Sequence, residues 1–255
     1  HMAMNSKDTI IAFANIWTVY LILRYCETQQ INNKRNYYSA LIGLTVGLGS
    51  GVRFAFIATL LPMLILLIVE IFYFKKFISS KFSIKFFFID LTKVLLIAYS
   101  LMVVFWPDTH GNIFISPFKL FFESSQSFFG TGWILFNGNY HSTIEVPKSY
   151  IIINLLYKTP EFVLICYGIL IYLFFNKKFT FSADFNFLRI KIFSILFIIF
   201  FTNIYLFVIP YRIYDGLRLF LYIVPYLSII PGLIIYFLIY DFKSVISKFF
   251  ITIIF

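Results

Sequence analysis

Two short charged stretches carry the residue types in this sequence that are best suited to chemistry. The first is MNSKD, in which Lys7 and Asp8 stand directly before an apolar run, and Arg53 follows a glycine-rich segment further on. The second is PYRIYDGLR, which contains Tyr211, Arg212, Tyr214, Asp215 and Arg218. Because a guanidinium can bind a phosphate through two parallel hydrogen bonds, these bases favour a phosphate-bearing ligand. Arg and Tyr also anchor helices at membrane surfaces, and we favour that role for Arg212 taken alone.

A long polar and aromatic segment, Trp106–Lys148, lies between apolar runs. Loops of this kind are uncommon unless they are functional or disordered, and disordered segments are poor in aromatic residues. Its central part includes Trp133, Asn137, Tyr140 and His141. Aromatic rings can stack on the C–H faces of a sugar while amides bond its hydroxyls, but the same composition suits docking on a membrane surface. Both interpretations stay open.

Acidic and histidine side chains in the same segment are the candidates for metal binding. Asp108 and His110 have a spacing that resembles a metal-ligating pair, and Glu123, His141 and Glu145 are further titratable groups. Because no third ligand is fixed by spacing, as structural zinc sites require, we interpret these residues as solvated loop residues.

The elements that would position these residues are long apolar segments. Hydrophobic residues make up 61% of the sequence and charged residues 13%. Runs close to the roughly twenty residues that cross a bilayer, without the alternation of a barrel strand, indicate an all-α polytopic membrane protein. We predict about seven transmembrane helices plus a truncated eighth in Val245–Phe255, and short interfacial helices over Ile113–Phe129. The predicted spans are Thr9–Leu23, Tyr37–Gly51, Phe54–Phe74, Phe86–Phe105, Ile151–Phe175, Ile190–Ile209 and Leu219–Tyr240.

The net charge of +10 is distributed as in a membrane protein and does not indicate nucleic acid. In this topology 13 of the 21 Lys and Arg residues lie in short loops on one side, seven lie towards the other, and Lys93 is near a boundary. Since positive residues mark the cytoplasmic side, residues 106–148 form an outer loop of a single transmembrane domain that covers residues 1–255. Lys93 and Asp90 have helical i,i+3 spacing, which we interpret as structural.

Small residues and prolines predict how these helices pack. Gly43, Gly47, Gly49 and Gly51 occur in the second predicted span, where small residues allow helices to approach closely. Pro160 interrupts the fifth predicted span and predicts a break there.

Several motifs occur in an order that resembles a known family. MNSKD is followed by GLTVGLGSGVR, by WPD at the start of the long loop, by LFNGNYHSTIEVPKSYIIINLLYKTPEFVLICYGIL, and by PYRIYDGLRLFLYIVP. These segments are similar to bacterial relatives of the protein O-mannosyltransferases, in which an outer loop carries "lF.G", then "lP..Y" and "ktP", with "YdGiRhflfvlP" downstream. The resemblance covers roughly Met4–Pro231.

The resemblance is to the GT-C class of membrane glycosyltransferases, family 39-like. It implies a multi-helix bundle whose outer loops form the active site of a mannosyltransferase-like enzyme of protein glycosylation. The donor would be a polyprenyl-phosphate-linked sugar, the acceptor a protein or glycolipid, and the reaction would usually invert the anomeric carbon. An acidic residue would act as the base or bind metal and acceptor, so a divalent metal ion is allowed as a cofactor. The implied location is a bacterial inner membrane, with the active side periplasmic or extracellular.

Departures from the family pattern limit what is carried over. The family's main acidic motif lies in an outer loop before the first segment seen here, so we expect a fragment that lacks this acid and is inactive alone. The "RH" of the family is Arg218-Leu219 here. The candidates are Asp8 as the catalytic residue, Lys7, Arg53, Arg212 and Arg218 for the donor phosphate, and Trp133, Asn137, His141, Tyr211 and Asp215 for the substrate.

Two other classes of function stay open. A flippase or transporter for a polyprenyl-linked glycan would need a polar pathway through the bundle, which the apolar fourth and sixth predicted spans do not favour. A non-catalytic membrane scaffold, or a ligase-like protein with one large outer loop, would place that loop late in a longer chain.

Overall fold

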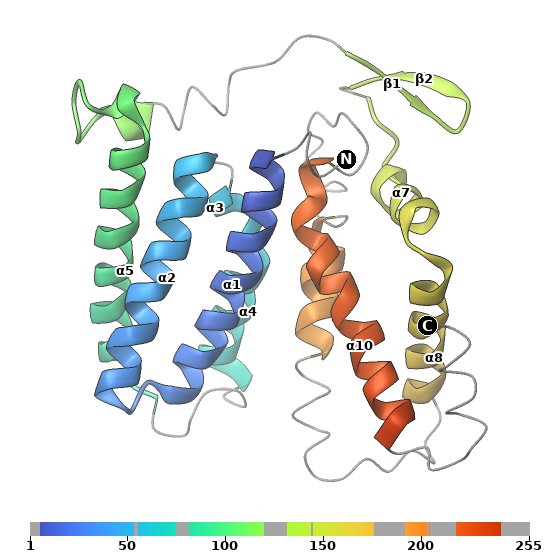
Figure 1. Cartoon of the computed structure of the whole chain (residues 1–255), viewed down its shortest axis with the longest axis horizontal. Helices are drawn as coiled ribbons and strands as arrows, with labels where there is room; N and C mark the ends of the chain where they lie inside the picture. Colours follow the sequence, from blue (N-terminus) through green and yellow to red (C-terminus); the bar gives the residue numbers. More distant parts are fainter. Residues whose placement is uncertain are drawn as a thin grey trace. The chain divides into compact units, whose positions relative to one another are not determined.

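The computed structural model describes residues 6–53, 56–74, 82–119, 132–143, 145–175, 192–202, 204 and 218–240. These residues are mainly helical, and the chain divides into two compact units, His1–Thr131 and Gly132–Phe255 (Figure 1). Among the described residues, two helical segments, Lys7–Thr28 and Ile84–Phe105, are long and apolar enough to cross a bilayer. A third crossing is counted if the bent pair of helices at 150–172 forms one span. The prediction of a mainly helical chain with apolar spans is therefore confirmed, whereas the predicted eighth segment lies outside the described residues.

The first unit is built on three long helices, α1 (Ser6–Thr28), α2 (Asn32–Val52) and α5 (Ile84–Phe105). A short turn reverses the chain between α1 and α2, with the Ile31 N–H donating to the Thr28 carbonyl at 3.0 Å. The two helices are therefore antiparallel neighbours, and α2 lies between α1 and α5 (Figure 1).

Glycines set the approach of α2 to α5. Along α2, Gly43, Gly47 and Gly51 recur every fourth residue and face, in the same order, the α5 side chains Ile97, Leu101 and Phe105. The matched order shows that α2 and α5 run parallel. A Cβ atom on Gly43 or on Gly47 would come within 2.8 Å of the facing side chain, which is closer than carbon atoms pack. The close packing predicted from these small residues is confirmed.

Hydrogen bonds between side chains join the apolar helices in the interior of this unit. Asn15 of α1 donates to the Thr59 hydroxyl at 2.8 Å, and Thr59 ends the short helix α3 (Phe56–Thr59). One turn further along α1, the Thr18 hydroxyl donates to the Thr45 hydroxyl of α2 at 2.9 Å. Since Asn15 and Thr18 are fully buried, these bonds satisfy polar groups that would otherwise be costly in an apolar interior.

Two predicted spans differ in detail from the structure. The second is longer than predicted, because α2 already begins in the polar sequence at Asn32 and reaches about 31 Å at 1.5 Å per residue. The third is divided into α3, α4 (Leu61–Val69) and a π-helical segment, Glu70–Phe74. The division falls at Leu60, and Pro62 follows two residues later in the first turn of α4, where a proline ring is tolerated.

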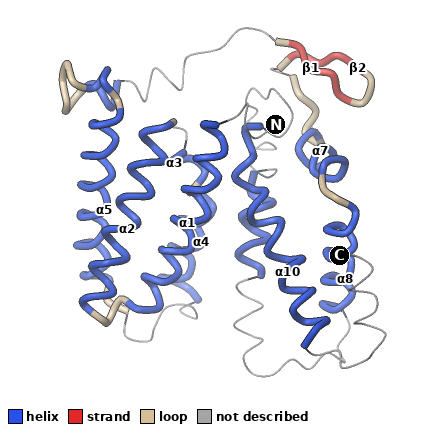
Figure 2. Tube along the Cα trace, in the orientation of Figure 1, coloured by secondary structure: helices blue, strands red, loops and turns tan. Residues whose placement is uncertain are grey.

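The second unit contains a β-hairpin, β1 (Trp133–Phe136) and β2 (Asn139–Ser142), followed by α7 (Tyr150–Lys158) and α8 (Glu161–Phe175) (Figure 2). The hairpin was not predicted, because we expected only helices in the long loop. The expected interfacial helices over Ile113–Phe129 are represented by one helical turn at 116–119, and residues 120–131 lie outside the described residues.

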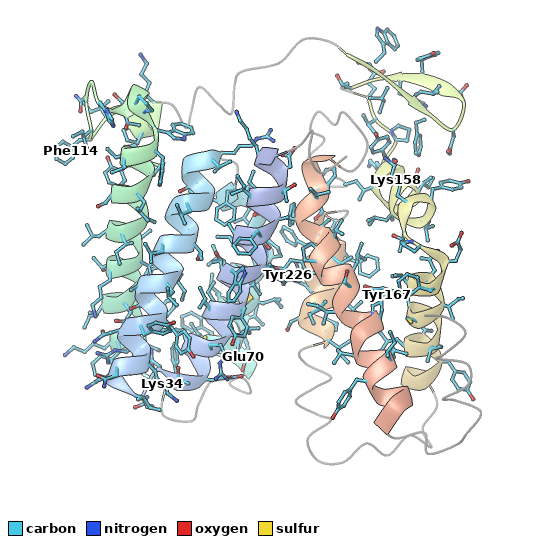
Figure 3. The ribbon with its side chains drawn as sticks, viewed as in Figure 1. Lys34, Glu70, Phe114, Lys158, Tyr167 and Tyr226 are labelled. Carbon is cyan, nitrogen blue, oxygen red and sulfur yellow. The ribbon has the colours of Figure 1, made fainter. Side chains whose placement is uncertain are left out.

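Pro160 breaks the fifth predicted span as expected, and α7 and α8 are bent by 111° at this point. The chain continues in a helical segment at 192–202, a 3-10 turn (Arg218–Ile223) and α10 (Val224–Tyr240). α8 packs on α10 through Cys166, Ile230 and Ile234, and the Tyr167 hydroxyl donates to the Leu227 carbonyl at 3.4 Å (Figure 3).

Candidate functional site

The structure brings two of the predicted site residues together at one end of the first unit. Asp8 lies in the first turn of α1, and Arg53 directly follows the last residue of α2. Asp8 Oδ1 is 3.4 Å from Arg53 Nη1, across 45 residues of sequence. Lys7, the third candidate at this end, is exposed beside Asp8. The antiparallel arrangement of α1 and α2 produces this cluster, because it places the start of one helix beside the end of the other.

Asp8 and Arg53 differ in how far their side chains are exposed. The Asp8 side chain is 7% exposed, whereas the Arg53 side chain is 39% exposed. A carboxylate at the start of a helix is stabilised by the helix dipole. The guanidinium has five N–H donors in a fixed plane, so Arg53 can face Asp8 with one side and bind a second anion with another.

Trp106 fixes the end of α2 that carries Arg53. It follows the last residue of α5, and its indole N–H donates to the Gly51 carbonyl, two residues before Arg53. The backbone of Arg53 is extended and its N–H donates to the Gly49 carbonyl at 3.2 Å. Sequence reasoning used Trp106 only to mark the beginning of the long loop. A tryptophan N–H that is partly withdrawn from water needs an acceptor, and this was the available signal that Trp106 links two elements.

Thr109 and His110 contact carbonyls at the end of α5. The Thr109 hydroxyl donates to the Trp106 carbonyl at 2.6 Å, and His110 Nε2 is 3.0 Å from the Val103 carbonyl. Both contacts add to backbone bonds at the end of α5, because the Val103 carbonyl also accepts from the Trp106 N–H at 3.4 Å and the Trp106 carbonyl from the Thr109 N–H at 3.0 Å. Within the described residues no group of three or more His, Cys, Asp or Glu side chains is placed to hold a metal ion, and the side chain of Asp108 lies outside them.

The hairpin separates the residues predicted to bind a sugar. Trp133 pairs with Ser142, so both lie on one face, while His141 pairs with Ile134 on the other. Asn137 occupies the turn with φ 50° and Gly138 follows with φ 81°, the backbone of a type I′ two-residue hairpin. Asn-Gly between apolar residues is the strongest short-range hairpin signal, and it was overlooked in the sequence.

The remaining candidates lie in a segment that the structure describes only in part. Tyr211, Arg212 and Asp215 lie outside the described residues, as does the side chain of Arg218, whose backbone begins the 3-10 turn. Their predicted roles stay predictions.

The opposite end of the first unit holds a second polar cluster around Asp90, which is 2% exposed. Asp90 accepts a hydrogen bond from the Tyr25 hydroxyl at 2.8 Å, and lies 3.4 Å from Arg35 Nε and 3.2 Å from Lys93 Nζ. Gln29 extends the cluster, because it bonds both the Tyr25 hydroxyl and the backbone of Ser83. Only the Asp90–Lys93 contact was predicted from the i,i+3 spacing.

The Asp90 cluster ties α1, α2 and α5 together at one end of the first unit, and the Asp8–Arg53 pair, with its half-exposed arginine, lies at the other end. The Asp8–Arg53 pair is the better candidate for a ligand site, because the carboxylate of Asp90 already has a hydroxyl and two cations around it. No protein family, no curated protein and no solved structure matches this chain, so its function has to be argued from this geometry.

Proposed function

We propose that this protein is a membrane glycosyltransferase that transfers a sugar from a polyprenyl-phosphate-linked donor to an acceptor at the outer face of the membrane. The observation that supports this most directly is the Asp8–Arg53 pair at the end of an apolar helix. A polyprenyl chain stays in the hydrocarbon and presents its phosphate at the surface. A cation that binds this phosphate therefore has to lie where an apolar helix ends, as Arg53 and Lys7 do.

The distribution of basic residues supports placing the Arg53 end of the first unit at the outer face of the membrane. Arg24, Lys34 and Arg35 lie at the end of the first unit opposite to Arg53, and Lys34 is seen there in Figure 3. In the proposed arrangement this basic end is cytoplasmic, following the positive-inside rule. The Arg53 end then faces the periplasm or the exterior of a bacterial inner membrane. Seven spans with a further apolar segment, as predicted from the sequence, complete the proposed fold.

Sugar transfer would require different roles of Asp8 and Arg53. In the transfer, an acceptor hydroxyl attacks the anomeric carbon, the bond from that carbon to the phosphate oxygen breaks, and negative charge increases on the phosphate. Arg53 and Lys7 would stabilise that charge, as positioned cations do at charge-developing oxygens. Asp8, which faces Arg53 and is largely buried, would hold the guanidinium in place. The acceptor proton needs a base, and Asp8 stays a predicted candidate for it.

A charge swap tests whether Arg53 binds the phosphate or only pairs with Asp8. The chain and its variants would be purified in mild detergent, immobilised, and assayed for retention of labelled polyprenyl phosphate by the protein. Transfer from polyprenyl-phosphate-mannose would be assayed after reconstitution in vesicles. Arg53→Gln should weaken retention about tenfold, because a charge-assisted hydrogen bond contributes about 1.5 kcal/mol or more. The Asp8→Arg/Arg53→Asp double variant should restore thermal stability, since the ion pair is rebuilt, but not retention.

Lys119→Gln is the matched control, because it removes a positive charge from the loop that follows α5 and leaves the Asp8–Arg53 pair unchanged. It should retain polyprenyl phosphate like the wild type. Recovery of both stability and retention in the swapped variant would mean that Arg53 has only a structural role. Transfer by the unmodified protein would support the transferase directly. Retention by the unmodified protein that is no better than retention by Arg53→Gln would contradict the lipid-phosphate site and, with it, the proposed transferase.

A further inference from the structure

The two faces of the β1–β2 hairpin differ in what covers them. The cross-strand pairs Trp133–Ser142 and Leu135–Tyr140 share one face, because residues paired across an antiparallel ladder point to the same side. On this face Trp133 is 71% exposed, Leu135 63% and Tyr140 73%. Three large side chains, two of them aromatic, are therefore open on one side of a four-residue ladder.

The other face is seated on the start of α7. Ile134 and Phe136 are buried there, and the Phe136 ring lies 5.0 Å from the ring of Tyr150, the first residue of α7. The Phe136 ring also meets the His141 ring at 6.2 Å. The hairpin thus has a defined attachment through one face, and its open face is directed away from that attachment.

The bend at Pro160 sets the direction of α7. Because α7 turns by 111° relative to α8, its axis lies nearly across the axis of α8. If the apolar α8 crosses a bilayer, α7 lies along the membrane surface, and the hairpin that sits on its first residue is at the same level. α7 exposes Ile152 and Leu156, one turn apart, and ends with the exposed Lys158 (Figure 3). An apolar stripe with a terminal cation is typical of helices in the membrane interface.

We propose that the open face of the hairpin, formed by Trp133, Leu135 and Tyr140, lies in the headgroup region of the lipid bilayer and anchors α7 there. Trp and Tyr concentrate at this depth because an apolar ring with one polar atom fits a boundary between hydrocarbon and water. A sugar is a weaker fit for this face. Asn137 is four residues from Trp133, roughly 13 Å along an extended strand, and His141 is on the other face.

A pair of neighbouring positions on opposite faces of the hairpin allows a direct test. Cysteine would be placed by Leu135→Cys on the open face, or by Asn139→Cys beside the turn on the attached face, in a chain whose Cys26 and Cys166 are replaced by alanine. Each variant would carry an environment-sensitive fluorophore and be reconstituted in vesicles of phosphatidylcholine and phosphatidylglycerol. All three tryptophans stay in place, so the Trp106 bond to the Gly51 carbonyl is kept.

Lipids brominated near the headgroup should quench the probe at position 135 strongly, and lipids brominated near the end of the acyl chain should quench it less. A water-soluble quencher should reach the probe at position 139 and not the one at 135. Tryptophan emission gives a second reading: lipids brominated near the headgroup should quench the wild type more than a Trp133→Phe variant, which keeps Trp17 and Trp106.

Two results would overturn the inference. If the water-soluble reagent quenched the probe at position 135 as strongly as the probe at position 139, the open face would be in water and free for a soluble ligand. Protection of position 135 from both kinds of quencher would mean that another part of the protein covers it. The test does not depend on sugar transfer. The membrane contact of the hairpin can therefore be contradicted while the proposed function holds, and the proposed function can be contradicted while the membrane contact holds.

Discussion

Alanine at Gly47 is a stringent test of the packing of α2 on α5. A Cβ atom at this position would lie 2.8 Å from Leu101 Cβ, 2.9 Å from Leu101 Cδ1 and 3.0 Å from Ala98 Cα. Carbon atoms in contact prefer about 3.5–4.0 Å, so the helices would have to separate by about 0.7 Å. Ala98 Cα belongs to the backbone and cannot turn aside. A separation at Gly47 would also loosen the contacts at Gly43 and Gly51, because a helix moves as a unit.

Two opposing effects determine the size of the change. Overpacking a close interface costs about 1–3 kcal/mol, and replacing glycine with alanine inside a helix gains about 1 kcal/mol. Alanine at Gly168 of α8 should show only the gain in helix propensity, because a Cβ atom there would meet nothing within 4 Å. Gly168→Ala should therefore raise the stability of its unit slightly, while Gly47→Ala should lower that of the first unit. The difference between the two changes isolates the packing cost.

A third substitution gives a graded comparison within the same interface. A Cβ at Gly51 would approach Phe105 Cβ at 3.2 Å, which is tight but relieved by a smaller shift than at Gly47. The free energy of unfolding would be measured by titrating SDS into mild detergent micelles and following tryptophan emission and far-ultraviolet circular dichroism. Stability should fall in the order wild type, Gly51→Ala, Gly47→Ala. Equal stability of all three would refute the close approach of the two helices.

Three further substitutions test the Asp90 cluster and the bend at Pro160. Asp90→Ala should destabilise the first unit by about 3 kcal/mol in the same titration, because it leaves the Arg35 side chain, which is 12% exposed, without its carboxylate partner. Tyr25→Phe should cost only about 1 kcal/mol, and equal costs would contradict the central place of the carboxylate. Pro160→Ala should let α7 and α8 join into one helix. The backbone distance between spin labels at Asn154 and Gly168 should then increase from about 13 Å to about 21 Å, at 1.5 Å per residue. An unchanged distance would mean that packing, and not the proline, holds the bend.

Local features of the fold could be predicted from the sequence, because their cause lies within a few residues. The glycines of α2 indicated a close helix contact, and Pro160 indicated a break. Asn137-Gly138 carried an equally local signal for the hairpin, and it was missed because the surrounding apolar runs favoured helices.

Contacts between distant residues could not be predicted in the same way. Charges near the outer end were expected from Asp8 and Arg53 separately, but their pairing depends on how α1 and α2 lie beside each other. The bond between Tyr25 and Asp90 joins residues 65 positions apart, and no spacing in the sequence encodes it. The direction of the open hairpin face likewise followed only from the register of the two strands.

The Asp90 cluster has a consequence for the order in which the protein is made. Tyr25 and Gln29 belong to α1 and Arg35 to α2, whereas their partners Ser83 and Asp90 follow more than fifty residues later. Since the chain is synthesised from its N-terminus, α1 and α2 leave the ribosome before the residues that complete their polar cluster. Arg35 therefore gains its carboxylate partner only when α5 arrives, and the same step joins the three helices at this end of the first unit.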